Sequence, residues 1–150
     1  MTSNDVISTL NDVIETCKDG EQGFRACAED VQNGEIKSML IQRSQHCADS
    51  AKELQSEVRR LGGDPDTHGS VSGALHRGWL NVKSAITGKD EAGVLAECER
   101  GEDVAVDRYK DALAHELPAD VRNLIERQYK GVLTNHELVR GLRDSARAQA

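Results

Sequence analysis

The chain has 150 residues, of which 30% are charged and 37% hydrophobic, with a formal net charge of −7. This length suits one domain with one hydrophobic core. The acidic balance argues against nucleic acid as a partner, because phosphate binding needs a basic surface. No segment approaches the ~20 apolar residues of a membrane span, and the acidic start MTSNDVISTLNDVIE does not resemble a signal peptide. We therefore expect a cytoplasmic protein that binds neither nucleic acid nor membranes.

Few residues favour β-structure, since aromatic residues make up 3% of the chain and many residues are good helix formers. The cysteines are far apart and form no C-x-x-C pair: Cys17, Cys27, Cys47 and Cys98. Without an export signal, this spacing predicts four reduced, partly buried thiols rather than a zinc–thiolate site.

Two apolar stripes with helical spacing predict a helical hairpin in the first part of the chain. The first stripe contains Val6, Leu10, Val13, Cys17, Phe24, Ala28 and Val31. Ser3 or Asn4 is its expected N-cap, and Asn33-Gly34 is expected to end the helix, with Gly34 suited to a C-cap. The second stripe contains Ile36, Leu40, Arg43, Cys47, Ala51, Leu54, Val58 and Leu61. It ends at LGGDPD (61–66), and the short link makes the two helices antiparallel neighbours.

A long connection follows over residues 67–90, in which 70–86 predicts a short or irregular helix that packs Trp79 onto the bundle. The third helix is expected from about 90 to 115, with one side formed by Val94, Leu95, Cys98, Ala105, Tyr109 and Ala112. Leu117-Pro118 interrupts it, and Pro118 suits the first turn of a fourth helix. The stripe of that helix contains Val121, Leu124, Ile125, Gln128, Val132, Leu133, Val139 and Leu142.

The short–long–short order of the connections predicts the fold class: all-α, a ferritin-like four-helix bundle of two antiparallel hairpins joined by a long, partly helical crossover. We expect one domain over residues 1–150, with the crossover at about 62–90. The second and third helices then run parallel. Amphipathic helices with a narrow polar side also indicate self-association, as a homo-oligomer and specifically a dimer.

Polar residues interrupt each apolar stripe and are the candidate metal ligands: Glu21, His46, Glu99, Glu102 and His136. At 1.5 Å rise per residue, Glu21 and His46 lie at nearly the same level of the first hairpin. In the second hairpin, Glu99 is closer to the level of His136 than Glu102 is.

These residue types matter because an ionised carboxylate inside a bundle is costly unless it is paired or liganded. Carboxylates and imidazoles from facing helices suit a divalent transition metal, here Fe, Zn or Mn. A metal-free polar network is the alternative, in which Arg43 pairs with Glu21 or Glu102 and the histidines hydrogen-bond to carboxylates.

Several motifs resemble one uncharacterised bacterial family of ferritin-like four-helix-bundle proteins: LGGDPDTHGS (61–70), GALHRGW (73–79), TGKD (87–90), CERGED (98–103) and HELVRGLRD (136–144). The resemblance covers essentially the whole chain and implies the fold, while the family has no assigned biochemical role.

The wider ferritin-like superfamily has a di-iron site, with one Glu from each of two helices and Glu-x-x-His from each of the other two. The resemblance would place Glu21 and Glu102 (or Glu99) at the single carboxylates, and His46 and His136 at the histidines. This sequence departs at the two bridging carboxylates, since Arg43 and Leu133 stand three residues before the histidines. The cation of Arg43 would also repel iron.

Three functions remain open, and fold alone does not choose among them. The first is a metal-binding bundle using the inward Glu and His residues. The alternatives are a metal-free structural or partner-binding module, and a degenerate di-metal oxidase or peroxidase with Tyr109 or Tyr129 nearby. GALHRGW either carries function on the crossover or only covers the core. Because no nucleophile–base pair, phosphate loop or dinucleotide motif is present, the sequence indicates a binding or structural role more than an enzyme.

Overall fold

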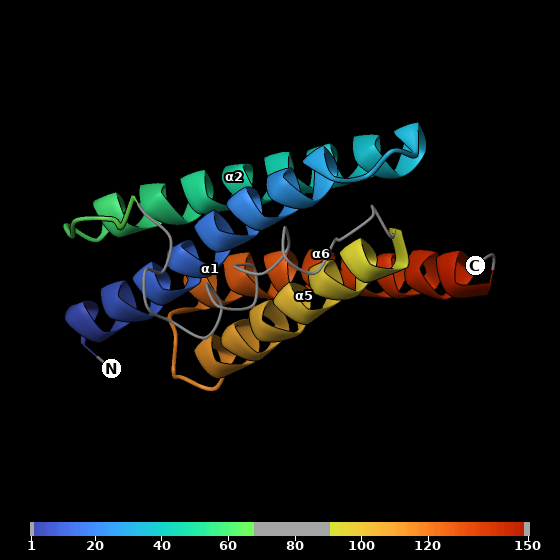
Figure 1. Cartoon of the computed structure of the whole chain (residues 1–150). Coiled ribbons are helices and arrows are strands. Elements are labelled where there is room, and N and C mark those ends of the chain that lie inside the picture. Colours follow the sequence, from blue (N-terminus) through green and yellow to red (C-terminus); the bar gives the residue numbers. More distant parts are fainter. Residues whose placement is uncertain (1, 68–90, 149–150) are drawn as a thin grey trace.

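The computed structural model describes residues 2–67 and 91–148, which contain four α-helices and no strand. The first hairpin is made of α1 (Ser3–Glu29) and α2 (Gly34–Arg60). The second is made of α5 (Glu91–Leu113) and α6 (Ala119–Ala148). Figure 1 shows the two hairpins side by side, with the N-terminus at one end of the bundle and the C-terminus at the other.

Two contacts between the hairpins show how they are oriented. At one end, the carboxylate of Glu91, the first residue of α5, accepts a hydrogen bond of 3.1 Å from the backbone N–H of Asn33, just before α2. At the other end, Arg60 at the end of α2 pairs at 2.7 Å with Asp120 at the start of α6. Helices α2 and α5 therefore begin at the same end and run parallel, as predicted (Figure 1).

The helix caps differ in detail from those expected. Thr2, rather than Ser3 or Asn4, caps α1, and its side chain forms a reciprocal capping box with Asp5. Helix α1 already ends at Glu29, so Asn33-Gly34 does not form its C-cap. Asn33 instead caps the N-terminus of α2, because its side-chain oxygen accepts hydrogen bonds from the next turn.

The segment after α2 is fixed against the first hairpin. Gly62 takes a positive φ of 85°, which favours glycine. A Cβ atom at Gly63 would lie 2.8 Å from the side chain of Ile7, so this close approach also requires glycine. The Asn11 side chain hydrogen-bonds to backbone groups of Asp64 and Asp66 at 3.2 and 2.9 Å.

The predicted stripes form most of the buried core, but the core is divided into two clusters along the bundle. One cluster holds Leu10, Leu54 and Ile125, and the other holds Phe24 and Leu95. Helix α1 packs against α2 and α5, and α5 packs against α6, whereas α2 and α6 meet only sparsely. Of these helix pairs, α2 and α6 are therefore the least closely packed.

Individual residues of the stripes differ in burial. Leu133 was expected on the inner face of the fourth helix but is 39% exposed, because Val132 takes the inward position. The four cysteines are free and buried, as predicted. The packing of Trp79 and the role of GALHRGW (73–79) lie outside the described residues. None of the described helices is both long enough and apolar enough to cross a membrane.

Candidate functional site

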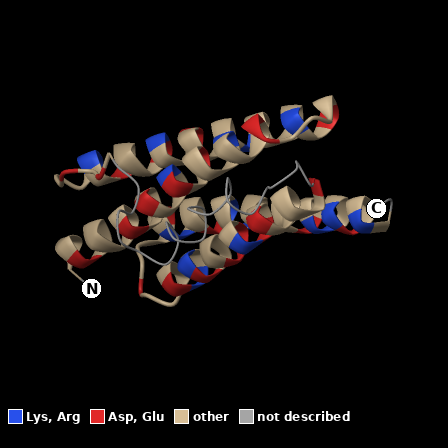
Figure 2. Cartoon of the chain, in the orientation of Figure 1, with Lys and Arg blue, Asp and Glu red and all other residues tan. Residues whose placement is uncertain are grey.

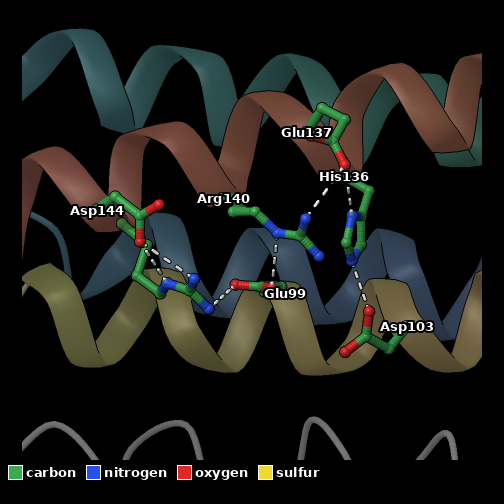
Figure 3. Close-up of polar contacts among 7 residues, drawn as sticks. Glu99, Asp103, His136, Glu137, Arg140 and Asp144 are labelled. Atoms are coloured by element: carbon green, nitrogen blue, oxygen red, sulfur yellow. Dashed lines mark hydrogen bonds and ion pairs between the residues drawn. The ribbon is translucent and has the colours of Figure 1, made fainter.

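Three side chains with metal-binding atoms converge between α5 and α6: Glu99, Asp103 and His136, whose candidate ligand atoms all lie within 4.8 Å of one another. Glu99 and Asp103 are four residues apart and therefore share one face of α5. His136 reaches them from α6 (Figure 3). We call these residues the Glu99–Asp103–His136 group.

His136 is held between acidic residues. Its Nε2 atom lies 2.5 Å from Oδ1 of Asp103, and its Nδ1 atom lies 3.7 Å from a carboxylate oxygen of Glu137. The His136 side chain is 9% exposed, while those of Asp103 and Glu137 are mostly exposed. The ring is thus buried at the surface edge of the bundle, where a carboxylate fixes its orientation.

Glu99 is buried and already ion-paired. Its carboxylate contacts the guanidinium of Arg143. It also lies 3.5 Å from Nε of Arg140 (Figure 3). Asp144 in turn holds Arg143 at 3.1 Å. Two arginines on the last turns of α6 therefore neutralise the most buried acid of the group.

Glu102 points to a different place, the middle of the bundle. It is 2% exposed, and Nδ2 of Asn135 donates a hydrogen bond of 2.7 Å to its Oε1 atom. Its Oε2 atom has no hydrogen-bond partner among the described residues. Burial raises the pKa of the Glu102 carboxyl to about 7, although the hydrogen bond from Asn135 and the nearby Arg43 and His136 oppose the shift.

A cavity of about 280 Å³ adjoins Glu102 and touches all four described helices. We call it the central cavity. Its lining includes Arg43 and His46 of α2, and Tyr109 and Gln128 from the second hairpin. Neither Glu21 nor the Glu99–Asp103–His136 group lines it.

The predicted set of site residues is therefore divided. Glu99 and His136 lie together, Glu102 and His46 line the central cavity, and Glu21 is held by Lys18 at 2.8 Å. His46 is exposed. Metal ligation by these residues stays a prediction.

The depth estimate holds for the first hairpin and needs correction in the second. The Ser44 hydroxyl donates a hydrogen bond of 2.7 Å to the backbone oxygen of Glu21, which places Glu21 within two residues of the level of His46. In the second hairpin, Asp103 rather than Glu99 lies level with His136. Asp103 and His136 are equally far along the chain from a point between Ala119 and Asp120, so the level pairing is centred later than the assumed turn at Leu117.

Sequence reasoning missed Asp103 because its side chain is 61% exposed and lies off the apolar stripe. The available signal was its spacing of four residues from Glu99, which places two carboxylates on one helix face. The predicted ion pair between Arg43 and a buried glutamate is also not found among the described residues. No ion pair of the described residues joins Arg43 to Glu21 or Glu102; the Arg43 guanidinium instead lies 5.9 Å from the ring centre of Phe24.

Comparisons with known proteins agree with the fold. A mutant of Dps1 from Mycobacterium smegmatis superimposes with a TM-score of 0.79 over 94% of this chain and 96% of its own, at 14% sequence identity. No curated protein matches the sequence significantly. The sequence profile of a domain of unknown function, DUF2383, matches residues 5–115. With this match and a ferritin-like fold, the chain belongs to the DUF2383 family of unknown function.

Proposed function

We propose that this protein binds a divalent transition metal, Fe, Zn or Mn, at the Glu99–Asp103–His136 group. The supporting observation is the convergence of one imidazole and two carboxylates within 4.8 Å. This donor set suits such ions, because imidazole and carboxylate are both common ligands for them. The ferritin-like fold of the chain agrees with metal handling by analogy only.

The residues fit a metal after two local adjustments. The contact of 2.5 Å between His136 and Asp103 must widen, since two ligand atoms of a tetrahedral ion with bonds of about 2.1 Å lie roughly 3.4 Å apart. Asp103 can move because its side chain is 61% exposed. Glu99 must exchange at least one arginine for the metal, and Arg140 is the more exposed of the two at 47%.

A two-metal centre is a poorer fit. The positions three residues before the two histidines hold Arg43 and Leu133, and Leu133 is 39% exposed, so its position does not face the interior. We therefore favour a single-ion site that binds or transfers metal.

The metal-free polar network remains the second candidate function, because Glu99 is already paired with Arg140 and Arg143. A protein of that kind would use the bundle as a structural or partner-binding module. The two candidates predict different responses to added metal.

The test is thermal unfolding of chelator-treated protein with and without Zn²⁺, Mn²⁺ or anaerobic Fe²⁺, combined with measurement of bound metal. We expect one of these ions to raise the melting temperature, with a gain of about 2.7 kcal/mol at a hundredfold excess over its Kd. The gain should decrease as the pH falls through the titration range of histidine, because a ligand must be deprotonated.

His136→Ala and Asp103→Ala should abolish the metal response. The matched control is His46→Ala, which removes an exposed histidine outside the group and should leave the response intact. Metal binding at the Glu99–Asp103–His136 group would be contradicted by melting temperatures that do not change with any of the three ions. It would also be contradicted if His136→Ala responded to metal as strongly as the wild type. In that case, destabilisation by His136→Ala in the absence of metal would support the structural network.

A further inference from the structure

The central cavity interrupts the hydrophobic core at the middle of the bundle. Cys17 and Val132 line it from one core cluster, and Phe24 and Cys47 line it from the other. Protein interiors are normally close-packed, and a void of this size weakens them. A ligand that filled the central cavity would therefore stabilise the bundle.

Small residues create the space. Gly20, Gly101 and Gly131 line the cavity from three different helices. A Cβ atom at Gly131 would meet nothing within 4 Å, whereas one at Gly20 would lie 2.9 Å from the Cys47 sulfur. The exposed members of the lining lie on α2 and α6, the two helices that meet only sparsely: His46, Asp49, Glu53, Arg127 and Gly131.

Two polar groups of the lining lack partners among the described residues. One is the Oε2 atom of Glu102, a residue that is 2% exposed. The other is the buried Nε atom of Arg43, whose guanidinium takes part in no ion pair of the described residues. Buried polar atoms almost always have a hydrogen-bond partner, so a pair of such atoms at one cavity indicates a ligand or water between them.

Several other polar groups of the lining already have partners. The Tyr109 hydroxyl donates a hydrogen bond of 2.8 Å to Gln128 and lies 3.3 Å from the Cys17 sulfur. At the edge, Arg127 pairs with Glu53 at 2.6 Å across the gap between α2 and α6. The buried polar atoms of the lining that lack a partner among the described residues are therefore Nε of Arg43 and Oε2 of Glu102, and they lie beside the apolar surface of Phe24, Ala105 and Val132.

We propose that the central cavity binds a small organic acid of about one-ring size that carries a hydroxyl group, with its carboxylate at Arg43 and its hydroxyl at Glu102. A carboxylate completes the guanidinium of Arg43 by a charge-assisted hydrogen bond. The hydroxyl can donate to the carboxylate form of Glu102 or accept from its protonated form. The volume is sufficient, since an apolar cavity of about 150 Å³ holds benzene.

This site is separate from the Glu99–Asp103–His136 group, and the proposal does not depend on metal binding. The Arg43 guanidinium, which forms no ion pair with the described residues, makes the central cavity a poor metal site and a suitable anion site. The ligand would join the two core clusters by filling the space between them.

The test uses the full chain after treatment with chelator. Three probes are titrated separately: 4-hydroxybenzoate, benzoate and phenol. Binding is measured by titration calorimetry and by amide chemical shifts of ¹⁵N-labelled protein. We expect 4-hydroxybenzoate to bind at least about tenfold more tightly than benzoate, which lacks the hydroxyl, or phenol, which lacks the carboxylate. The largest shifts should fall on the amides of Gly20, Gly101 and Gly131.

Variants locate the binding. Arg43→Met should weaken 4-hydroxybenzoate binding about tenfold or more, whereas Arg25→Met, an exposed arginine on α1, should not. Gly131→Leu should weaken binding by occupying the cavity, and Gly141→Leu, at another open position of α6, is its control. Circular dichroism confirms that each variant is folded.

Three results would overturn the proposal. One is the absence of binding by 4-hydroxybenzoate, which would leave water as the occupant. Another is equal binding of the three probes, and the third is binding that survives both Arg43→Met and Gly131→Leu. None of these results bears on whether added metal raises the melting temperature. The proposal of ligand binding and the proposal of metal binding are therefore tested independently.

Discussion

At the scale of single residues, the chain holds ionisable groups in surroundings that oppose ionisation. Burial raises the pKa of the Cys17 thiol to about 12 and that of Cys47 to about 11. Burial likewise raises the pKa of Glu102 to about 7. The thiols therefore stay protonated at neutral pH, whereas Glu102 titrates near neutral pH and makes the stability of the folded state sensitive to pH.

Glu102 should make folding stability fall as the pH rises. Its folded pKa exceeds the ordinary value of 4.5, so its contribution is fully present below about pH 4.5 and is lost as the pH rises through about 7. Glu102→Gln does not titrate. In chelator, the unfolding free energy of this variant relative to the wild type should rise by about 2–3 kcal/mol between pH 5 and pH 8.

Urea unfolding at several pH values measures this difference. Glu116→Gln, at an exposed position in the connection between α5 and α6, controls for the loss of a glutamate. A difference that does not change with pH would show that Glu102 remains ionised in the folded protein.

The four thiols should react slowly in the native protein. A thiolate must attack the disulfide of DTNB, and burial keeps Cys17, Cys47 and Cys98 protonated and covered. At pH 8 we expect Cys47 to react first, since it is 8% exposed and lines the central cavity. All four should react at once in 6 M guanidinium chloride; rapid reaction of several thiols in the native state would contradict this burial.

At the scale of helices, the side chain of Asn33 determines where α2 begins. Its oxygen accepts hydrogen bonds of 3.0 and 3.1 Å from the backbone N–H groups of Glu35 and Ile36. Asn33→Ala should therefore lower the unfolding free energy by about 1 kcal/mol, as measured by urea unfolding. Asn33→Asp retains an acceptor at the cap and is the control; equal loss from both variants would show that the cap is not the cause.

At the scale of the whole molecule, acidic and basic residues are interspersed along the described helices (Figure 2). Some large apolar side chains of these helices are also exposed. Leu138 is 48% exposed and Ile41 is 53% exposed. Leu138 borders a groove of about 350 Å³ with Ile36, Met39 and Leu142, where the start of α2 meets the end of α6. This groove is the surface we expect to mediate self-association.

Light scattering should accordingly give about twice the chain mass of 16.4 kDa. Leu138→Lys should shift the protein towards the monomer, because a charge at the groove opposes its burial. Ile41→Lys tests an equally exposed residue outside the groove and should have less effect. A wild-type mass of one chain at high concentration would contradict the predicted dimer.

The helices, their pairing into hairpins and the parallel orientation of α2 and α5 could be predicted from the sequence. These features depend on local information: apolar spacing near 3.6 residues, Gly and Pro at the connections, and loop lengths that limit the topology. The caps were displaced by one or a few residues, because Thr2 and Asn33 compete with neighbouring polar residues for the same role.

The site depended on tertiary structure, because a shift of one residue along a helix turns a side chain by about 100° and moves it about 1.5 Å. The sequence identified Glu99 and His136 as inward polar residues. Only the packing of α5 against α6 brought Asp103 to His136 and directed Glu102 to the central cavity. The cavity itself arises where small residues of separate helices meet, and no single stretch of sequence contains that information.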